Sequence, residues 1–187
     1  MFDNAPEVAY LVGVIAAAIV RKWGVRGQER DTGKGLERVL LILGAFGMFV
    51  IPFIYLFTEW LDFADYWTLP YMAPAGGGVF VVAIWMLWRS HKDLGKNWAT
   101  VAKIRKKQTL VTTGIYSRIR HPMYTSHLLW SIAQILLLQN WIAGPAMLVL
   151  TIPLYAVRIP KEEKMLLNEF KEYRGYMKKT GRLLPKF

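Results

Sequence analysis

Uninterrupted apolar runs are the feature that most constrains this chain. Residues 123–157 contain no Asp, Glu, Lys or Arg over thirty-five positions, residues 39–58 none over twenty, and residues 66–88 none over twenty-three. These runs are continuously apolar rather than apolar on one helical face, which favours membrane spans over a soluble amphipathic fold. A shorter run, residues 8–20, ends at Arg21-Lys22.

The longest run requires two helices. As one helix, residues 123–157 would be about 52 Å long, well beyond the roughly 30 Å hydrocarbon core of a bilayer. Gln139-Asn140 and Gly144-Pro145 lie near its middle and are typical of a turn. The sequence therefore predicts an all-α integral membrane fold of five spans. The last two spans form a helical hairpin, and a cytoplasmic C-terminal helix follows, beginning at Pro160.

The charges are distributed as a multi-pass membrane protein requires. All 24 Lys and Arg fall in residues 21–38, 89–120 and 158–186, whereas the loop over residues 59–65 carries only acidic charge. Under the positive-inside rule the three basic segments face the cytoplasm. Five spans then put the N-terminus outside, in a cell membrane if the source is prokaryotic, and the C-terminus inside. The acidic flank before the first run predicts an uncleaved anchor rather than a signal peptide.

We expect one membrane domain over residues 1–187, with three spans in 1–88 and the polar motifs in 89–187. Positive-inside loops explain the net charge of +11, and they favour anionic lipid head groups. No nucleic-acid recognition motif accompanies the charge, so no nucleic-acid partner is predicted. No obligate protein partner is predicted either.

The composition also limits the chemistry. The chain has no cysteine, which excludes disulfides, a thiolate nucleophile and a Cys-ligated metal. A metal site built from His91, His121 and His127 is disfavoured, because residues six apart lie on different helix faces. We therefore predict no metal.

Two polar motifs bracket the longest apolar run. Arg120-His121-Pro122-Met123-Tyr124 precedes it, and Arg158-Ile159-Pro160-Lys161-Glu162-Glu163 follows it. A hairpin would return both motifs to one membrane surface, where ionisable groups are costly unless they are paired or functional. Taken singly, these residues are explained by positive-inside anchoring, by complementing a helix dipole and by the interfacial aromatic belt. Their joint occurrence indicates a functional site.

Further residues extend the motifs into a longer pattern. It comprises Gly114-Ile115-Tyr116-x-x-x-Arg120-His121-Pro122-x-Tyr124, then Glu162-Glu163, then a Tyr-rich segment and Arg182-x-x-Pro185. This pattern resembles the isoprenylcysteine carboxyl methyltransferase and phospholipid methyltransferase family of membrane proteins. The resemblance covers roughly residues 85–187, including His91-Lys92-x-Leu94-Gly95-x-Asn97-Trp98. Ser126 departs from it, since many relatives have Gly there, and the short chain fits a compact prokaryotic member.

The resemblance implies methyl transfer from S-adenosylmethionine to a lipophilic acceptor from the bilayer, with S-adenosylhomocysteine as the other product. Methyl transfer is an in-line displacement that depends on alignment and on exclusion of water. In this interpretation Arg158 orients an acceptor carboxylate and Glu162 holds Arg158 in place. The expected cofactor-binding residues are Leu110, Val111, Gly114, Tyr116, Arg120, His121, Pro122, Tyr124, Glu163 and Arg182.

The sequence leaves three kinds of methyl acceptor possible. A carboxylate of isoprenylcysteine type is preferred because of Arg158, and it needs no general base at pH 7. A phospholipid amine would need deprotonation, by Glu162 or His121. A small thiol or other lipophile is the third kind. A non-enzymatic transporter subunit or scaffold would instead need ionisable groups along the spans, where only His127 occurs in the three long runs.

Overall fold

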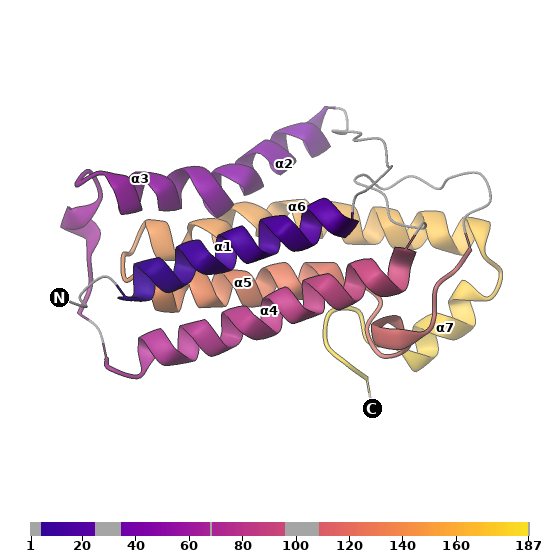
Figure 1. The fold of residues 1–187 in the computed structure, drawn as a ribbon. Coiled ribbons are helices and arrows are strands. Elements are labelled where there is room, and N and C mark those ends of the chain that lie inside the picture. The colour runs from indigo at the N-terminus through magenta and orange to yellow at the C-terminus, as the bar shows by residue number, and fades with distance from the viewer. Residues whose placement is uncertain (1–4, 25–34, 68, 96–108, 187) are drawn as a thin grey trace.

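The computed structural model describes residues 5–24, 35–67, 69–95 and 109–186 of the chain. Within these ranges regular structure is helical, and strand-like pairing is confined to two isolated bridges. The predicted all-α class is therefore confirmed for the described residues. The α-helices, drawn in Figure 1, are α1 (Ala5–Gly24), α2 (Leu36–Ala45), α3 (Ile51–Phe57), α4 (Met72–Leu94), α5 (Pro122–Leu137), α6 (Ala143–Glu169) and α7 (Tyr173–Lys179).

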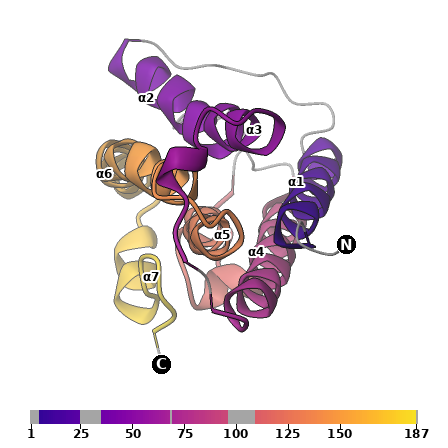
Figure 2. The same ribbon diagram turned by 90° about the vertical axis from the view of Figure 1, so that its left-hand side faces the viewer.

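The long helices run side by side along one axis. Seen end on in Figure 2, α5 lies in the middle of the bundle, with α1, α4, α6 and the α2–α3 segment around it. Among the described residues, three helical segments are long and apolar enough to cross a membrane: Leu36–Phe57, Met72–Leu94 and Ala143–Glu169. Helix α5 has sixteen residues and lies in the centre of the bundle. The apolar exteriors of the three long segments indicate a membrane protein.

The helices α2 and α3 are continuous through one π-helical segment, η1 (Phe46–Val50). Gly47 lies so close to α6 that a Cβ on it would be 2.5 Å from the Ala146 carbonyl oxygen. Glycine is therefore required for this approach. A π-helical turn frees carbonyls from the regular helical hydrogen-bond pattern. Side chains of α1 and α5 donate hydrogen bonds to two carbonyls of η1.

A buried polar knot holds η1 to the rest of the bundle. The Tyr10 hydroxyl lies 3.0 Å from both the Met48 carbonyl and Gln134 Oε1, and it shares its proton between them. Nε2 of Gln134 donates to the carbonyls of Gly47 (3.1 Å) and Ala143 (2.7 Å). One glutamine thus connects α1, η1, α5 and α6 inside an otherwise apolar core.

The predicted turn between the last two spans is present. Helix α5 ends at Leu137 and α6 begins at Ala143. Oδ1 of the buried Asn140 accepts from the amides of Ile142 and Ala143, both at 2.9 Å. Its Nδ2 donates to the Asp65 carboxylate at 2.8 Å. Asn140 therefore caps α6 and fixes the acidic 59–65 loop to this end of the bundle.

The prediction that a separate C-terminal helix begins at Pro160 is wrong. Helix α6 continues through Pro153 and Pro160 to Glu169. A proline removes one backbone donor, and burial of Ile159 and Glu163 on either side of Pro160 holds the helix together there. The chain turns instead at Phe170, which is extended, and the short α7 follows. The residues after Pro160 are therefore divided between the end of α6 and the separate helix α7.

We expect Gln134→Met to lower the free energy of unfolding by about 1–3 kcal/mol, because interhelical hydrogen bonds in membranes contribute modestly and two carbonyls lose their donor. Unfolding by detergent titration in mixed micelles measures the change. The same substitution at the half-exposed Gln139 is the control, and equal losses at both positions would contradict a structural role of the knot.

Candidate active site

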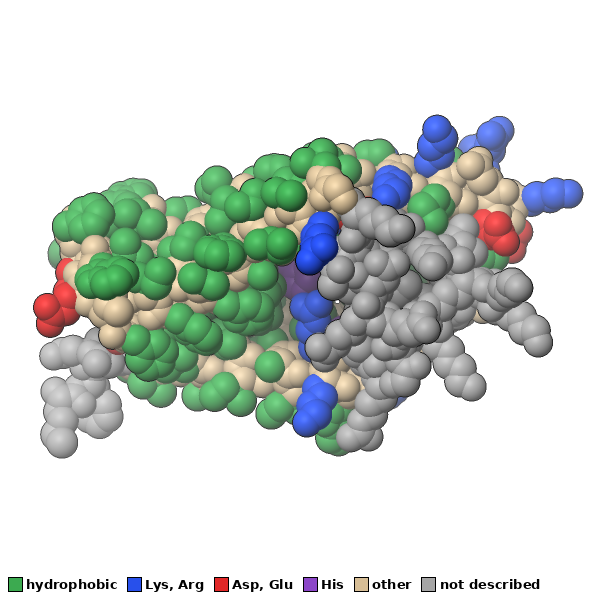
Figure 3. Space-filling model, turned by 90° about the horizontal axis from the view of Figure 1, so that it is seen from above, with side chains coloured by type: hydrophobic (Ala, Val, Ile, Leu, Met, Phe, Trp, Pro, Cys, Tyr) green, Lys and Arg blue, Asp and Glu red, His purple; other side chains and the backbone are tan. Residues whose placement is uncertain are grey.

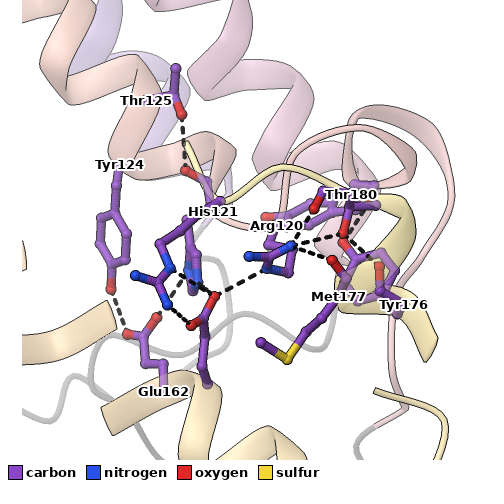
Figure 4. A network of polar contacts seen from close by, with 11 residues as sticks. Arg120, His121, Tyr124, Thr125, Glu162, Tyr176, Met177 and Thr180 are labelled. Atoms are coloured by element: carbon purple, nitrogen blue, oxygen red, sulfur yellow. Dashed lines mark hydrogen bonds and ion pairs between the residues drawn. The ribbon is translucent and has the colours of Figure 1, made fainter. Parts of the chain in front are cut away.

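The two predicted motifs meet at one end of the hairpin. Arg120 and His121 immediately precede α5, and Glu162 and Glu163 lie on α6 directly opposite (Figure 4). Pro122 is the first residue of α5, where its missing N–H costs nothing. The carboxylates of Glu162 and Glu163 are each surrounded by a group of polar side chains, and the two groups adjoin.

Glu163 is the centre of the first group. Its side chain is buried, and Oε1 accepts a hydrogen bond from Arg120 Nε at 3.0 Å. Oε2 accepts from Arg182 Nη2 at 2.5 Å. Nε2 of His121 lies 3.4 Å from Oε1. One buried carboxylate thus holds three basic side chains from two segments far apart in the sequence.

Arg120 links this group to α7. Its Nη1 donates to the Met177 carbonyl at 3.0 Å and to both the carbonyl and the hydroxyl of Thr180. The Tyr176 hydroxyl donates to the Tyr116 carbonyl at 2.6 Å. Figure 4 shows Arg120 extended between α6 and α7. Protein groups therefore engage Nε and Nη1 of the Arg120 guanidinium.

The C-terminal segment returns along the residues before α5. The amides of Arg120 and His121 donate to the carbonyls of Gly181 (2.9 Å) and Arg182 (3.1 Å). The Thr125 hydroxyl donates to the Leu183 carbonyl at 2.6 Å. This pairing brings Arg182 to Glu163.

Glu162 is the centre of the second group. Its Oε1 accepts from the Tyr124 hydroxyl at 2.5 Å and from Arg158 Nη2 at 3.1 Å. Its Oε2 lies 3.6 Å from His121 Nδ1. The Tyr124 ring stacks on His121 with centroids 5.5 Å apart, and the Arg158 guanidinium lies 5.8 Å from the same ring. His121 and Tyr124 therefore join the two groups.

The sequence analysis missed Glu37. This buried residue in the first turn of α2 places Oε1 3.6 Å from Arg158 Nε, and its Oε2 accepts from Lys161 Nζ at 2.7 Å. An acid at a helix start is ordinarily explained by the helix dipole. Its partners lie more than a hundred positions later, so the sequence carries no direct signal of the contact.

His121 is buried between two carboxylates. Burial by itself lowers the pKa of a histidine, but here the contacts with Glu162 and Glu163 outweigh it and raise the pKa of His121 above its ordinary value of 6.5. The two carboxylates therefore stabilise the imidazolium form of His121.

The remaining predicted residues lie around the 3-10 turn η4 (Gly114–Ser117). Gly114 has a φ of +60° and lies against the Asp93 carboxylate, so a Cβ would clash there. Asp93 Oδ2 accepts from the Ile115 amide at 2.7 Å and fixes η4 to the end of α4. Leu110 and Val111 are half-exposed in the segment before η4. Asp93 belongs to the motif at 91–98, of which residues 96–98 lie outside the described ranges.

Among the described residues, no group of three or more His, Asp or Glu side chains is arranged to hold a metal ion. His127 lies deeper in the bundle, where its Nδ1 is 3.0 Å from the Tyr155 hydroxyl.

The fold and site define a class: an all-helical membrane protein with a buried cluster of ion pairs at one end of a helical hairpin. Residues 77–168 match the profile of the isoprenylcysteine carboxyl methyltransferase (ICMT) family. This region contains both motifs, and the match supports assignment of these residues to that family.

Relatives from several organisms support the assignment. The chain is 34% identical to protein-S-isoprenylcysteine O-methyltransferase B of Arabidopsis thaliana over 94 residues, which are 49% of this chain and 48% of the relative. It is 33% identical to the cobalt-zinc-cadmium resistance protein CzcN of Cupriavidus metallidurans over 108 residues, 57% of this chain and 50% of the relative. The Saccharomyces cerevisiae protein-S-isoprenylcysteine O-methyltransferase is 34% identical over 94 residues, 49% and 39% of the two chains. The chain thus spans half or less of the length of these relatives.

We expect the stability difference between the wild type and His121→Gln to depend on pH. Because the folded-state pKa of His121 is raised above 6.5, its contribution is fully present below that value and is lost as the pH rises through the folded pKa. Thermal unfolding of both proteins between about pH 5.5 and 8.5 measures the difference, which should shrink towards alkaline pH. A constant difference over this range would show that His121 does not change its protonation state there.

Proposed function

We propose that the protein transfers a methyl group from S-adenosylmethionine to a lipophilic acceptor at the cytoplasmic membrane face. The preferred acceptor is a carboxylate of isoprenylcysteine type, which becomes a methyl ester. The observation that carries the proposal is the placement of Arg158 beside the Glu163 group, at the end of the apolar hairpin within the family region. Two of the relatives are protein-S-isoprenylcysteine O-methyltransferases, which supports this acceptor class.

The Glu163 group has the polar atoms that such a cofactor requires. Nε2 of His121 and the hydroxyl of Tyr173 are buried and make no hydrogen bond within the described residues. Burial raises the pKa of the Tyr173 hydroxyl, and the charge of Glu163 adds to the rise. Buried polar atoms without partners are costly. A ligand with a carboxylate, an ammonium and ribose hydroxyls would satisfy them.

The cofactor, when bound, supplies an electrophilic methyl group on a sulfonium. His121, Tyr173 and Glu163 would hold its polar groups, and Arg182, half exposed at the rim, would pair with its carboxylate. The other residues predicted to line this site are Leu110, Val111, Gly114, Tyr116, Arg120, Pro122 and Tyr124.

Arg158 would orient the acceptor. It is buried, bound to Glu162 and covered by the Tyr124 ring. A carboxylate is already ionised at neutral pH, so the protein has to align it and exclude water rather than remove a proton. An amine acceptor fits less well, because Glu162 and Glu163 raise the pKa of His121 and favour its protonated form, which cannot accept a proton, and Glu162 is already bound by Tyr124 and Arg158.

The proposed topology has five spans, with the N-terminus outside and the C-terminus in the cytoplasm. The charges of the described residues support it, because the apolar half of the surface in Figure 3 carries no Lys or Arg. The same view shows a histidine between apolar side chains on one side and basic ones on the other.

Binding of S-adenosylhomocysteine to the protein in lipid nanodiscs tests the cofactor site. We expect one site, and an affinity about 5- to 30-fold lower in Tyr173→Phe, because one hydrogen bond to the ligand is lost. The fold of that variant loses no described hydrogen bond, so its thermal stability should be unchanged without ligand. Tyr71→Phe, exposed at the start of α4, is the control. No binding to the folded wild type would refute the cofactor assignment.

Turnover with a labelled methyl donor and an N-acylated S-prenylcysteine tests the acceptor site. We expect Arg158→Gln to raise the acceptor KM by about 30-fold or more, since one partner of a buried charge pair is removed. The affinity for S-adenosylhomocysteine should stay within about twofold, because Arg158 belongs to the Glu162 group. Equal losses of both affinities would indicate that Arg158 only maintains the fold.

A further inference from the structure

Arg158 is already flanked by two carboxylates of the protein itself. Nη2 donates to Glu162 at 3.1 Å, and Nε lies 3.6 Å from Glu37. Nε and Nη2 form the side edge of the guanidinium, which is one of the edges that bind a carboxylate through two parallel hydrogen bonds. In this structure the edge is divided between two different acids.

The two acids are not held equally. Glu162 also accepts from the Tyr124 hydroxyl at 2.5 Å and lies on the same helix as Arg158, four residues later. Glu37 comes from α2. Its Oε1 is buried and accepts no hydrogen bond within the described residues. Glu37 is therefore the weaker partner of Arg158.

Glu37 has an alternative partner at the rim. Its Oε2 accepts from Lys161 at 2.7 Å, and the Lys161 side chain is 50% exposed, against 8% for Glu37. A long, half-exposed lysine can follow a carboxylate outwards at little cost. Glu37 thus forms a hydrogen-bonded ion pair with Lys161 through Oε2, but with Arg158 only a longer ion pair through Oε1.

We propose that Glu37 is a specificity-determining residue that occupies the acceptor's place beside Arg158 Nε. This inference rests on the proposed acceptor role of Arg158. An acidic acceptor must displace Glu37 towards Lys161 before it can pair with the side edge of Arg158, whereas a neutral ligand leaves the contact intact. Glu37 therefore lowers the affinity for carboxylates selectively and facilitates release of the uncharged ester.

Three substitutions separate contact from charge. Glu37→Gln removes the competing charge, and Glu37→Asp keeps the charge but shortens the side chain, so that it no longer reaches Arg158. Lys161→Gln removes the group that draws Glu37 away from Arg158. Lys164→Gln is the matched control, because Lys164 is an exposed lysine on the same helix.

The measurement is direct binding of an N-acylated S-prenylcysteine acid and of its methyl ester, in nanodiscs with S-adenosylhomocysteine present. We expect Glu37→Gln and Glu37→Asp to tighten acid binding by about three- to tenfold, and Lys161→Gln to weaken it by a similar factor. Ester binding should change less than about twofold in every variant. If the Glu37–Lys161 ion pair only stabilises the fold, Glu37→Gln and Lys161→Gln would instead change the affinity for the acid in the same direction.

Several results would overturn the inference. If Glu37→Asp behaves like the wild type while Glu37→Gln binds the acid more tightly, long-range charge rather than contact is responsible. If both Glu37 variants bind the acid more weakly, Glu37 positions Arg158 and does not compete for it. Absence of acid binding in all the proteins also overturns it. Because the assay needs no turnover, a protein that binds the acid as expected but transfers no methyl group refutes the proposed function alone.

Discussion

The pairing of the buried Glu163 carboxylate with three basic groups is the interaction on which the site depends. Removing a carboxylate from water costs several kcal/mol unless partners surround it. Arg120 and His121 arrive from the start of α5, and Arg182 arrives from the C-terminal segment. These partners bring two pieces of chain, distant in sequence, to one carboxylate. The return of residues 181–183 along residues 118–121, and the docking of α7 through Arg120, are consequences of satisfying this one charge.

Helix α6 carries residues of both proposed binding sites on one continuous helix. Arg158, Glu162 and Glu163 lie within six positions, so the residues proposed to bind the acceptor and the cofactor keep a constant separation. His121 and Tyr124 connect them from α5. In a reaction governed by alignment, such a rigid arrangement matters more than an additional acid or base.

The bundle separates its polar interactions by depth. Asn140, the 59–65 loop and the Gln134 knot lie towards one end, and the ion pairs of Glu37, Glu162 and Glu163 occupy the other end. Apolar side chains cover the helices between these levels, as Figure 3 shows for one face. This distribution suits the proposed function, in which the acceptor comes from the bilayer and the cofactor from water.

The sequence by itself determined the helical class, the hairpin turn and the meeting of the two motifs. Apolar runs, the turn residues at 139–145 and a helix-starting proline are local signals, and they act within a few residues of where they stand. Only the tertiary structure decided the contacts of Glu37, the unpartnered hydroxyl of Tyr173, the π-helical turn and the return of Arg182. It also decided that Pro160 lies inside α6, because packing of the flanking residues outweighs the loss of one backbone hydrogen bond. Each of these features depends on segments that are distant in sequence, whose proximity no local pattern encodes.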